Sequence, residues 1–164
     1  MTDREPVRVI FVCWGNICRS PMAERIAISY AERDGLTGVE FTSAATSSEE
    51  LGEPMDPRAA RTLRRHGYPA DDHVAHQIDR AELGRADLVI AMEDLHVQRL
   101  HRLDPDAGIA LLTDFDPAAE PGSGVPDPWY GSESGFLDTL NAIEAAMPGI
   151  IDRARTLAES RASG

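Results

Sequence analysis

The chain has 164 residues, of which sixteen are basic and 28 are acidic, and its net charge of −12 disfavours nucleic acid and anionic membranes as partners. Hydrophobic residues at 42% and charged residues at 27% match ordinary globular usage and argue against disorder, collagen and coiled coil. All the basic residues are arginine, which excludes a lysine-dependent nucleotide loop, a Schiff-base enzyme and pyridoxal phosphate chemistry.

The predicted elements alternate between strands and helices. A short β-branched run predicts a buried parallel strand at residues 7–12, and Ser20-Pro21 predicts the N-cap and first position of a helix that Gly35 ends. There follow a strand at 39–43, a helix at 57–66, a short helix opened by Asp79, a strand at 86–91, a helix at 94–102, a strand at 109–112, a loop at 114–131 and a helix with an apolar stripe over 136–157. This alternation predicts one α/β domain over residues 1–164, with a parallel sheet covered by helices on both faces.

Two cysteines, Cys13 and Cys18, lie in one short segment. A disulfide closing so small a loop would stabilise little, and a zinc site would lack its second ligand pair. Met1 to Pro6 are mostly polar, and no apolar run approaches the roughly 20 residues of a membrane helix. We therefore expect reactive thiols in a soluble cytoplasmic monomer with no membrane partner and no metal. The lysine-free, arginine- and alanine-rich composition suggests a bacterial source with a GC-rich genome.

The segment from Cys13 to Ser20 carries the most chemical information. Five residues separate Cys13 from Arg19, between a strand and a helix start, so successive N–H groups can converge on one anion. Gly15 permits a tight turn and Asn16 tolerates left-handed backbone. Arg19 can bind two phosphate oxygens, and the same positive field favours the thiolate of Cys13. The pattern predicts a cysteine nucleophile in a phosphate cradle.

These residues closely resemble the low-molecular-weight protein tyrosine phosphatase family. The likeness covers essentially the whole chain: the loop from Cys13 to Ser20, then Ser43-Ala44-Ala45-Thr46, Arg65-His66-Gly67 and Asp127-Pro128-Trp129-Tyr130. It implies a three-layer fold with strand order 2-1-3-4, activity on tyrosine-phosphorylated proteins, phosphate or vanadate as competing ligands, and no cofactor. It also implies that Cys13 becomes a phosphocysteine and that Arg19 binds the phosphoryl oxygens.

A proton donor is needed at the leaving oxygen, because a phenolate leaves poorly. Among the loop carboxylates, Asp114, Asp116 and Asp127 are equally suitable by residue type alone. The resemblance selects Asp127, first as general acid and then as base for the attacking water.

The supporting residues are also implied by the resemblance. Ser20 would donate a hydrogen bond to Cys13, and Asn16, Ser43 and His73 would hold the loop shape. Cys18 is either a small loop filler or the partner of a reversible disulfide with an oxidised Cys13. Three further histidines receive no role, because they are expected near helix ends or on exposed faces; these are His66, His96 and His101.

Substrate would contact the loop and two aromatic side chains. The loop positions are Trp14, Gly15, Asn16, Ile17 and Cys18, and the aromatic wall is Trp129 with Tyr130. The chain departs from frequent family choices at Trp14, where a smaller residue is usual, and at Glu49, where many members carry an aromatic residue.

Three alternatives remain open. A phosphoarginine phosphatase on the same scaffold would carry Thr in place of Ile17, so Ile17 favours phosphotyrosine. A phosphate-binding module without catalysis would lack the nucleophile or the acid, and both are present. A redox sensor built on Cys13 and Cys18 would keep its function without Asp127. An arsenate reductase would need a further redox cysteine, which this chain lacks.

Overall fold

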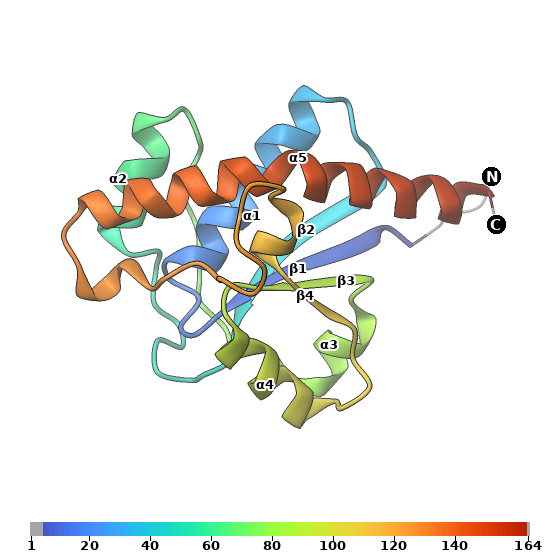
Figure 1. Ribbon diagram of the computed structural model, residues 1–164, viewed down its shortest axis with the longest axis horizontal. Helices are drawn as coiled ribbons and strands as arrows, with labels where there is room; N and C mark the ends of the chain where they lie inside the picture. Colours follow the sequence, from blue (N-terminus) through green and yellow to red (C-terminus); the bar gives the residue numbers. More distant parts are fainter. Residues whose placement is uncertain (1–4, 164) are drawn as a thin grey trace.

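A parallel sheet of four strands forms the centre of the molecule, as the computed structural model in Figure 1 shows. The structure describes residues 5–163, and the polar start at residues 1–4 lies outside the described residues. The strands are β1 (Val7–Cys13), β2 (Val39–Ala45), β3 (Leu88–Ala91) and β4 (Ile109–Leu111), in the order β2-β1-β3-β4. The predicted fold class and strand order are confirmed.

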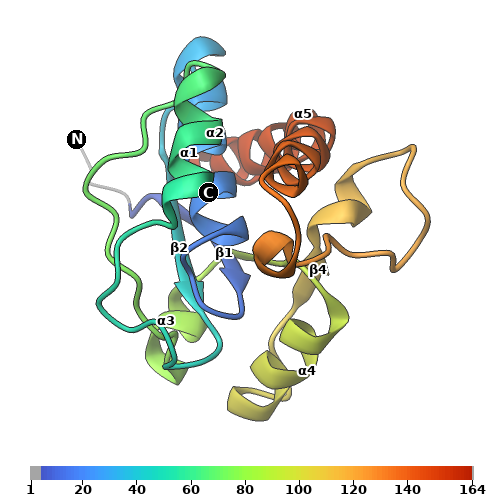
Figure 2. The same ribbon diagram turned by 90° about the vertical axis from the view of Figure 1, so that its left-hand side faces the viewer.

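Helices cover both faces of this sheet. On one face lie α1 (Arg19–Arg33), α2 (Pro57–Arg65) and α5 (Ser134–Ser163), and on the other lie α3 (Arg80–Arg85) and α4 (Asp94–Leu103), as Figure 2 shows. Within residues 5–163, no helix is long and apolar enough to cross a membrane.

The alternation of side chains along β1 places the reactive cysteine. Val9 and Phe11 belong to the apolar cluster with α1 and α5, whereas Ile10 and Val12 belong to the cluster with α3 and α4. Because successive side chains of a strand point to opposite faces, Cys13 falls on the α1 side at the carboxyl end of β1. Ligands of parallel sheets bind beyond such strand ends.

Several predicted boundaries were wrong. Helix α1 begins at Arg19 with Cys18 at the N-cap position and no side-chain cap, so Ser20 is not the cap. The hydroxyl of Ser20 instead lies beside the sulfur of Cys13, which leaves the first N–H groups of the helix uncapped. Strand β3 begins at Leu88 rather than residue 86, and β4 ends at Leu111, because the next residues form the 3-10 turn η1 (Leu112–Phe115).

The loop predicted at 114–131 contains a second 3-10 turn, η2 (Pro128–Tyr130). The cap predicted for α2 is confirmed: Asp56 accepts a hydrogen bond from the backbone N–H of Arg58 at 2.8 Å. The guanidinium of Arg58 returns to the same carboxylate at 2.9 Å. Arg58 also donates to the carbonyl of Trp129 at 3.4 Å, which ties α2 to η2.

Candidate active site

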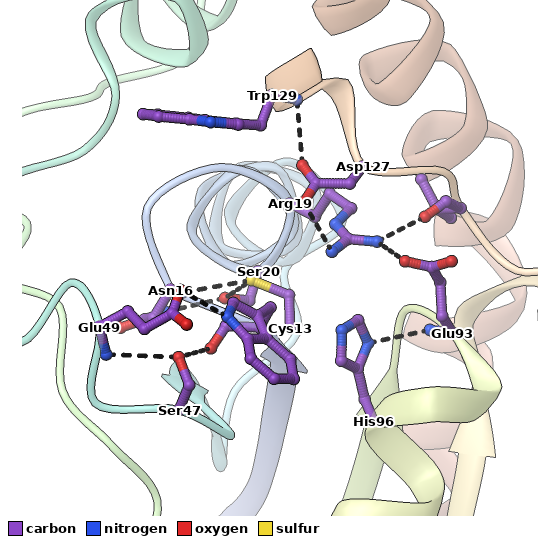
Figure 3. A network of polar contacts seen from close by, with 12 residues as sticks. Cys13, Asn16, Arg19, Ser20, Ser47, Glu49, Glu93, His96, Asp127 and Trp129 are labelled. Carbon is purple, nitrogen blue, oxygen red and sulfur yellow. Dashed lines mark hydrogen bonds and ion pairs between the residues drawn. The ribbon is translucent and has the colours of Figure 1, made fainter.

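The sulfur of Cys13 lies where β1 turns into α1, with the close surroundings drawn in Figure 3. The cysteine is 2% exposed, and its Sγ is 3.0 Å from the hydroxyl oxygen of Ser20. The backbone N–H of Asn16 donates to the same sulfur at 3.4 Å. Both contacts place hydrogen-bond donors around the sulfur, which stabilises negative charge on it.

Asn16 holds the loop in its curled shape. Its backbone has φ of 62°, in the left-handed region that the sequence predicted for it, and the residue is fully buried. Its side chain donates to the Ser20 oxygen at 2.8 Å and accepts from the N–H of His76 at 3.2 Å. Since the Ser20 oxygen accepts from Asn16, its own hydrogen is left to donate, either to the Cys13 sulfur at 3.0 Å or to the more distant carbonyl of Ala44 at 3.5 Å.

His73 supports the same residue from outside the loop. Its ring Nε2 lies 2.6 Å from the carbonyl oxygen of Asn16, so this nitrogen donates. Burial lowers the pKa of His73 below its ordinary value, which keeps the ring neutral in that role.

Arg19 closes the loop opposite the sulfur. Its side chain is 3% exposed; the guanidinium pairs with Glu93, donates to the carbonyl of Val125 at 2.8 Å, and lies 3.6 Å from Asp127. Figure 3 shows these partners arriving from different elements. Within residues 5–163 the buried Nε of Arg19 has no partner, and an oxyanion in the pocket would supply one.

His96 lies in the first turn of α4, near a helix end as predicted, but it is fully buried. Its Nδ1 accepts from the backbone N–H of Glu93 at 3.1 Å. Burial lowers the pKa of His96 to about 3, helped by the positive charges of Arg19 and Arg99, so the ring is neutral. Sequence reasoning missed both Glu93 and His96. The available signal was the position of Glu93, just past the end of β3.

Asp127 is the only one of the three candidate acids that lies at the pocket. One of its oxygens accepts from the N–H of Trp129 at 3.0 Å, and the other faces Arg19. Asp114 and Asp116 accept from backbone N–H groups of their own turns at 2.9 Å and line no part of the pocket.

The pocket over the sulfur has a volume of about 90 Å³. It is lined by Cys13, Trp14, Gly15, Ile17, Cys18, Arg19, Glu49, Glu50, Asp127, Trp129 and Tyr130. Most of the predicted substrate contacts are therefore together, drawn from two segments more than a hundred residues apart. Among residues 5–163, no group of three or more His, Cys, Asp or Glu side chains is arranged to hold a metal ion.

Two predicted residues lie differently from expectation. Asn16 is not part of the pocket lining, because its side chain points to Ser20 beneath the loop. Ser43 donates to Glu24 on α1 at 2.8 Å and does not support the loop directly. Gly15 lines the pocket as predicted, and a Cβ there would lie 3.0 Å from the Glu50 side chain.

Cys18 is buried, and both cysteines are free thiols. Burial raises the pKa of the Cys18 thiol far above its ordinary value, with the carboxylate of Asp56 adding to the effect. This thiol therefore stays protonated and is a weak nucleophile beside Cys13.

Comparisons with known proteins identify the family of this chain. The sequence model of the family described as "Low molecular weight phosphotyrosine protein phosphatase" matches residues 8–162. A low molecular weight protein-tyrosine-phosphatase of Streptomyces coelicolor is 43% identical over 162 residues, covering 95% of this chain and 98% of that protein.

Solved structures share the fold. YfkJ of Bacillus subtilis superposes with a TM-score of 0.86 at 28% identity, covering 94% of this chain and 98% of its own. The YwlE arginine phosphatase, as a cysteine-to-serine mutant with a phosphorylated active-site serine, gives 0.80 at 29%, covering 90% and 95%. Fold and relatives together define a phosphoric monoester hydrolase. The chain belongs to the low molecular weight phosphotyrosine protein phosphatase family.

Proposed function

We propose that this chain hydrolyses phosphotyrosine in proteins through a phosphocysteine intermediate on Cys13, with residues 1–164 acting as one phosphatase domain. The observation that carries the proposal is the sulfur itself. It lies at a strand end, in a pocket, with the Ser20 hydroxyl at 3.0 Å and Arg19 closing the opposite side. The uncapped start of α1 adds its positive end to the same pocket.

The first step transfers the phosphoryl group to sulfur. The Cys13 thiolate forms a bond to phosphorus while the bond from phosphorus to the tyrosine oxygen breaks. Asp127 gives its proton to the departing oxygen, so tyrosine leaves as the neutral phenol. Arg19 and the loop N–H groups bind the phosphoryl oxygens, whose charge must be stabilised in the transition state.

The second step releases phosphate. A water molecule attacks phosphorus as Asp127 takes its proton, and the bond from phosphorus to sulfur breaks. The sulfur leaves as a thiolate, which the Ser20 hydrogen bond stabilises. Asp127 ends the cycle protonated, ready for the next substrate. A phosphorylated active-site serine in the YwlE mutant supports transfer of phosphate to the equivalent position.

Phosphoarginine is the alternative substrate, since one structural relative is described as an arginine phosphatase. Ile17 lines the pocket of this chain and is largely buried. Its apolar side chain offers no hydrogen bond to a guanidinium, whereas a threonine would. We therefore expect faster hydrolysis of a phosphotyrosine peptide than of the matched phosphoarginine peptide, and Ile17→Thr to move this preference toward phosphoarginine.

Alkylation of the thiols tests the nucleophile directly. Iodoacetate at neutral pH should label Cys13 rapidly and Cys18 slowly, and inorganic phosphate or vanadate should protect Cys13. If Cys13 reacts no faster than free cysteine and phosphate gives no protection, the proposal fails. Activity should also survive EDTA, because the mechanism uses no metal. A thiolate enzyme of this kind suits the reducing cytoplasm, where we propose that it acts.

A further inference from the structure

Trp14 is fixed in place on several sides at the edge of the pocket. Its indole N–H donates to the Glu49 carboxylate at 2.9 Å. Its carbonyl oxygen accepts from the backbone N–H of Ser47 at 3.0 Å and from the Ser47 hydroxyl at 2.9 Å. The guanidinium of Arg99 lies over the indole ring, 4.5 Å from the ring centroid.

Arg99 comes from α4, far from Trp14 in sequence. It is held by a hydrogen bond from its guanidinium to the carbonyl of Thr46 at 3.1 Å. A cation over an indole face is an attractive interaction, and a partly buried one is the stronger for it. Arg99 does not line the pocket, whereas Trp14 does, so the guanidinium covers a ring face of a pocket-lining side chain from outside the pocket.

The opposite wall of the pocket is built the same way. Arg58 lies over the ring of Trp129 at 5.1 Å and over Phe136 at 4.7 Å, and is itself paired with Asp56. The chain has two tryptophans. Both line this pocket, and both are backed by an arginine.

We propose that Trp14 is a specificity-determining residue, whose indole contacts the aryl ring of the substrate as a fixed second wall. Arg99 acts through Trp14 and is a positioning residue, and Glu49 sets the direction of the indole. The proposal rests on the proposed hydrolysis of aryl phosphates. Many family members carry an aromatic residue at the position of Glu49. In this chain, the Glu49 carboxylate instead holds the indole of Trp14, which comes from the loop.

A wall held from outside adds selectivity at low entropic cost, because the indole is already ordered before substrate arrives. Flat aryl groups gain stacking contact with it, and the gain grows with ring area. In the proposed mechanism the phosphoryl group is bound by the loop N–H groups and Arg19, not by the indole side chain. Changes at Trp14 and Arg99 should therefore alter binding of the ring and leave the chemical step unchanged.

The test compares phenyl phosphate with 2-naphthyl phosphate by measuring kcat and KM for each. Both carry the same dianionic group, so the ratio of their KM values compares the two rings, and the change of this ratio in a variant reports the contribution of the altered side chain. The native enzyme should bind the naphthyl compound more tightly. Trp14→Leu and Arg99→Met should each reduce this KM ratio, by about fivefold for Trp14→Leu, while kcat changes by less than about twofold.

Matched variants separate the wall from general effects. Trp14→Phe and Arg99→Lys keep a ring and a cation, so each should recover most of the ratio. Glu49→Gln keeps an acceptor for the indole and removes the charge, and should preserve the ratio. Arg102→Met, an exposed change on the same helix, should behave as the native protein. If Trp14→Leu does not fold, as judged by thermal melting, the comparison of Arg99→Met with Arg99→Lys provides the test.

The outcomes distinguish the two proposals. An unchanged ratio in Trp14→Leu and Arg99→Met, or tighter naphthyl binding in Trp14→Leu, overturns the role of Trp14, since the indole would then be packing or an obstacle. If the native enzyme hydrolyses neither aryl phosphate, the proposed function itself is overturned.

Discussion

The two sides of the pocket are built to different degrees of rigidity. On the nucleophile side, Cys13 and Asn16 are almost completely buried and tied to one another by interlocking hydrogen bonds. On the acid side, Trp129 is 45% exposed and Tyr130 is 88% exposed, and the segment rests on a three-residue turn. Asp127 begins that turn and holds it through one backbone hydrogen bond.

This difference matches what each side has to do. A thiolate nucleophile and its phosphate cradle need fixed distances, which buried and mutually satisfied polar groups provide. In the proposed mechanism the acid has to meet a leaving oxygen on a bulky protein substrate and then let the product go, which requires an accessible segment. Arg58 is the contact that keeps the accessible side in place.

The largest expected loss of activity is on the nucleophile side of the pocket. Cys13→Ser removes the nucleophile, so kcat for aryl phosphates should fall by at least about 10³-fold. Phosphate or vanadate should still bind, because the loop N–H groups and Arg19 remain; calorimetry measures this. Near-normal turnover in the variant would contradict a covalent intermediate on sulfur.

The next largest loss of activity is expected on the acid side of the pocket. Asp127→Ala should lower kcat by about 10² to 10³-fold for a poor leaving group such as phenol, and much less for p-nitrophenol, which needs no proton. Asp127→Asn is the matched variant, since its side-chain oxygen can still accept from Trp129. An equal loss for both leaving groups would mean that another group is the acid.

A third prediction concerns His96, the buried histidine on the nucleophile side of the pocket. The folded pKa of His96, about 3, lies below its ordinary value of 6.5, so the unfolded chain takes up a proton first as the pH falls. The contribution of His96 to stability is complete above about pH 6.5 and is lost progressively toward pH 3, at about 1.4 kcal/mol per pH unit.

Urea unfolding from pH 7 to pH 4 measures this slope. His96→Asn cannot titrate, yet its side-chain oxygen can accept from Glu93, so its free energy of unfolding should fall less steeply with acid. His101→Asn, an exposed histidine near the end of the same helix, should keep the native slope. Parallel slopes for the native protein and His96→Asn would show that His96 is not held neutral.

The smallest expected effect tests the contact that steadies the accessible side. Arg58→Met removes the cation over Trp129 and the hydrogen bond to its carbonyl, so kcat should fall by about threefold to tenfold. Arg61→Met, one turn along α2, breaks only an exposed ion pair with Glu133 and should leave kcat unchanged. Equal behaviour of the two variants would show that the acid segment needs no support from α2.

Local signals explain why much of the fold could be predicted. The apolar run of β1 and the Asp56 cap of α2 act within a few residues, and both were found. The Ser20 cap was predicted wrongly for an informative reason. Serine before proline at a helix start is a cap by local rules, but here the sulfur of Cys13, seven residues earlier in the same loop, takes the hydroxyl.

The sequence by itself determined the nucleophile loop, because Cys13, Asn16, Arg19 and Ser20 lie within eight residues whose backbone is set by one strand end and one helix start. Only the tertiary structure showed that Glu93, His96 and Arg99 lie at that loop, whereas Asp127, equal to other loop carboxylates by residue type, was selected by the family resemblance. Their approach depends on strand order and on the paths of long connections. The cost of closing such connections changes slowly with their length, so sequence separation carries little information about which distant residues meet.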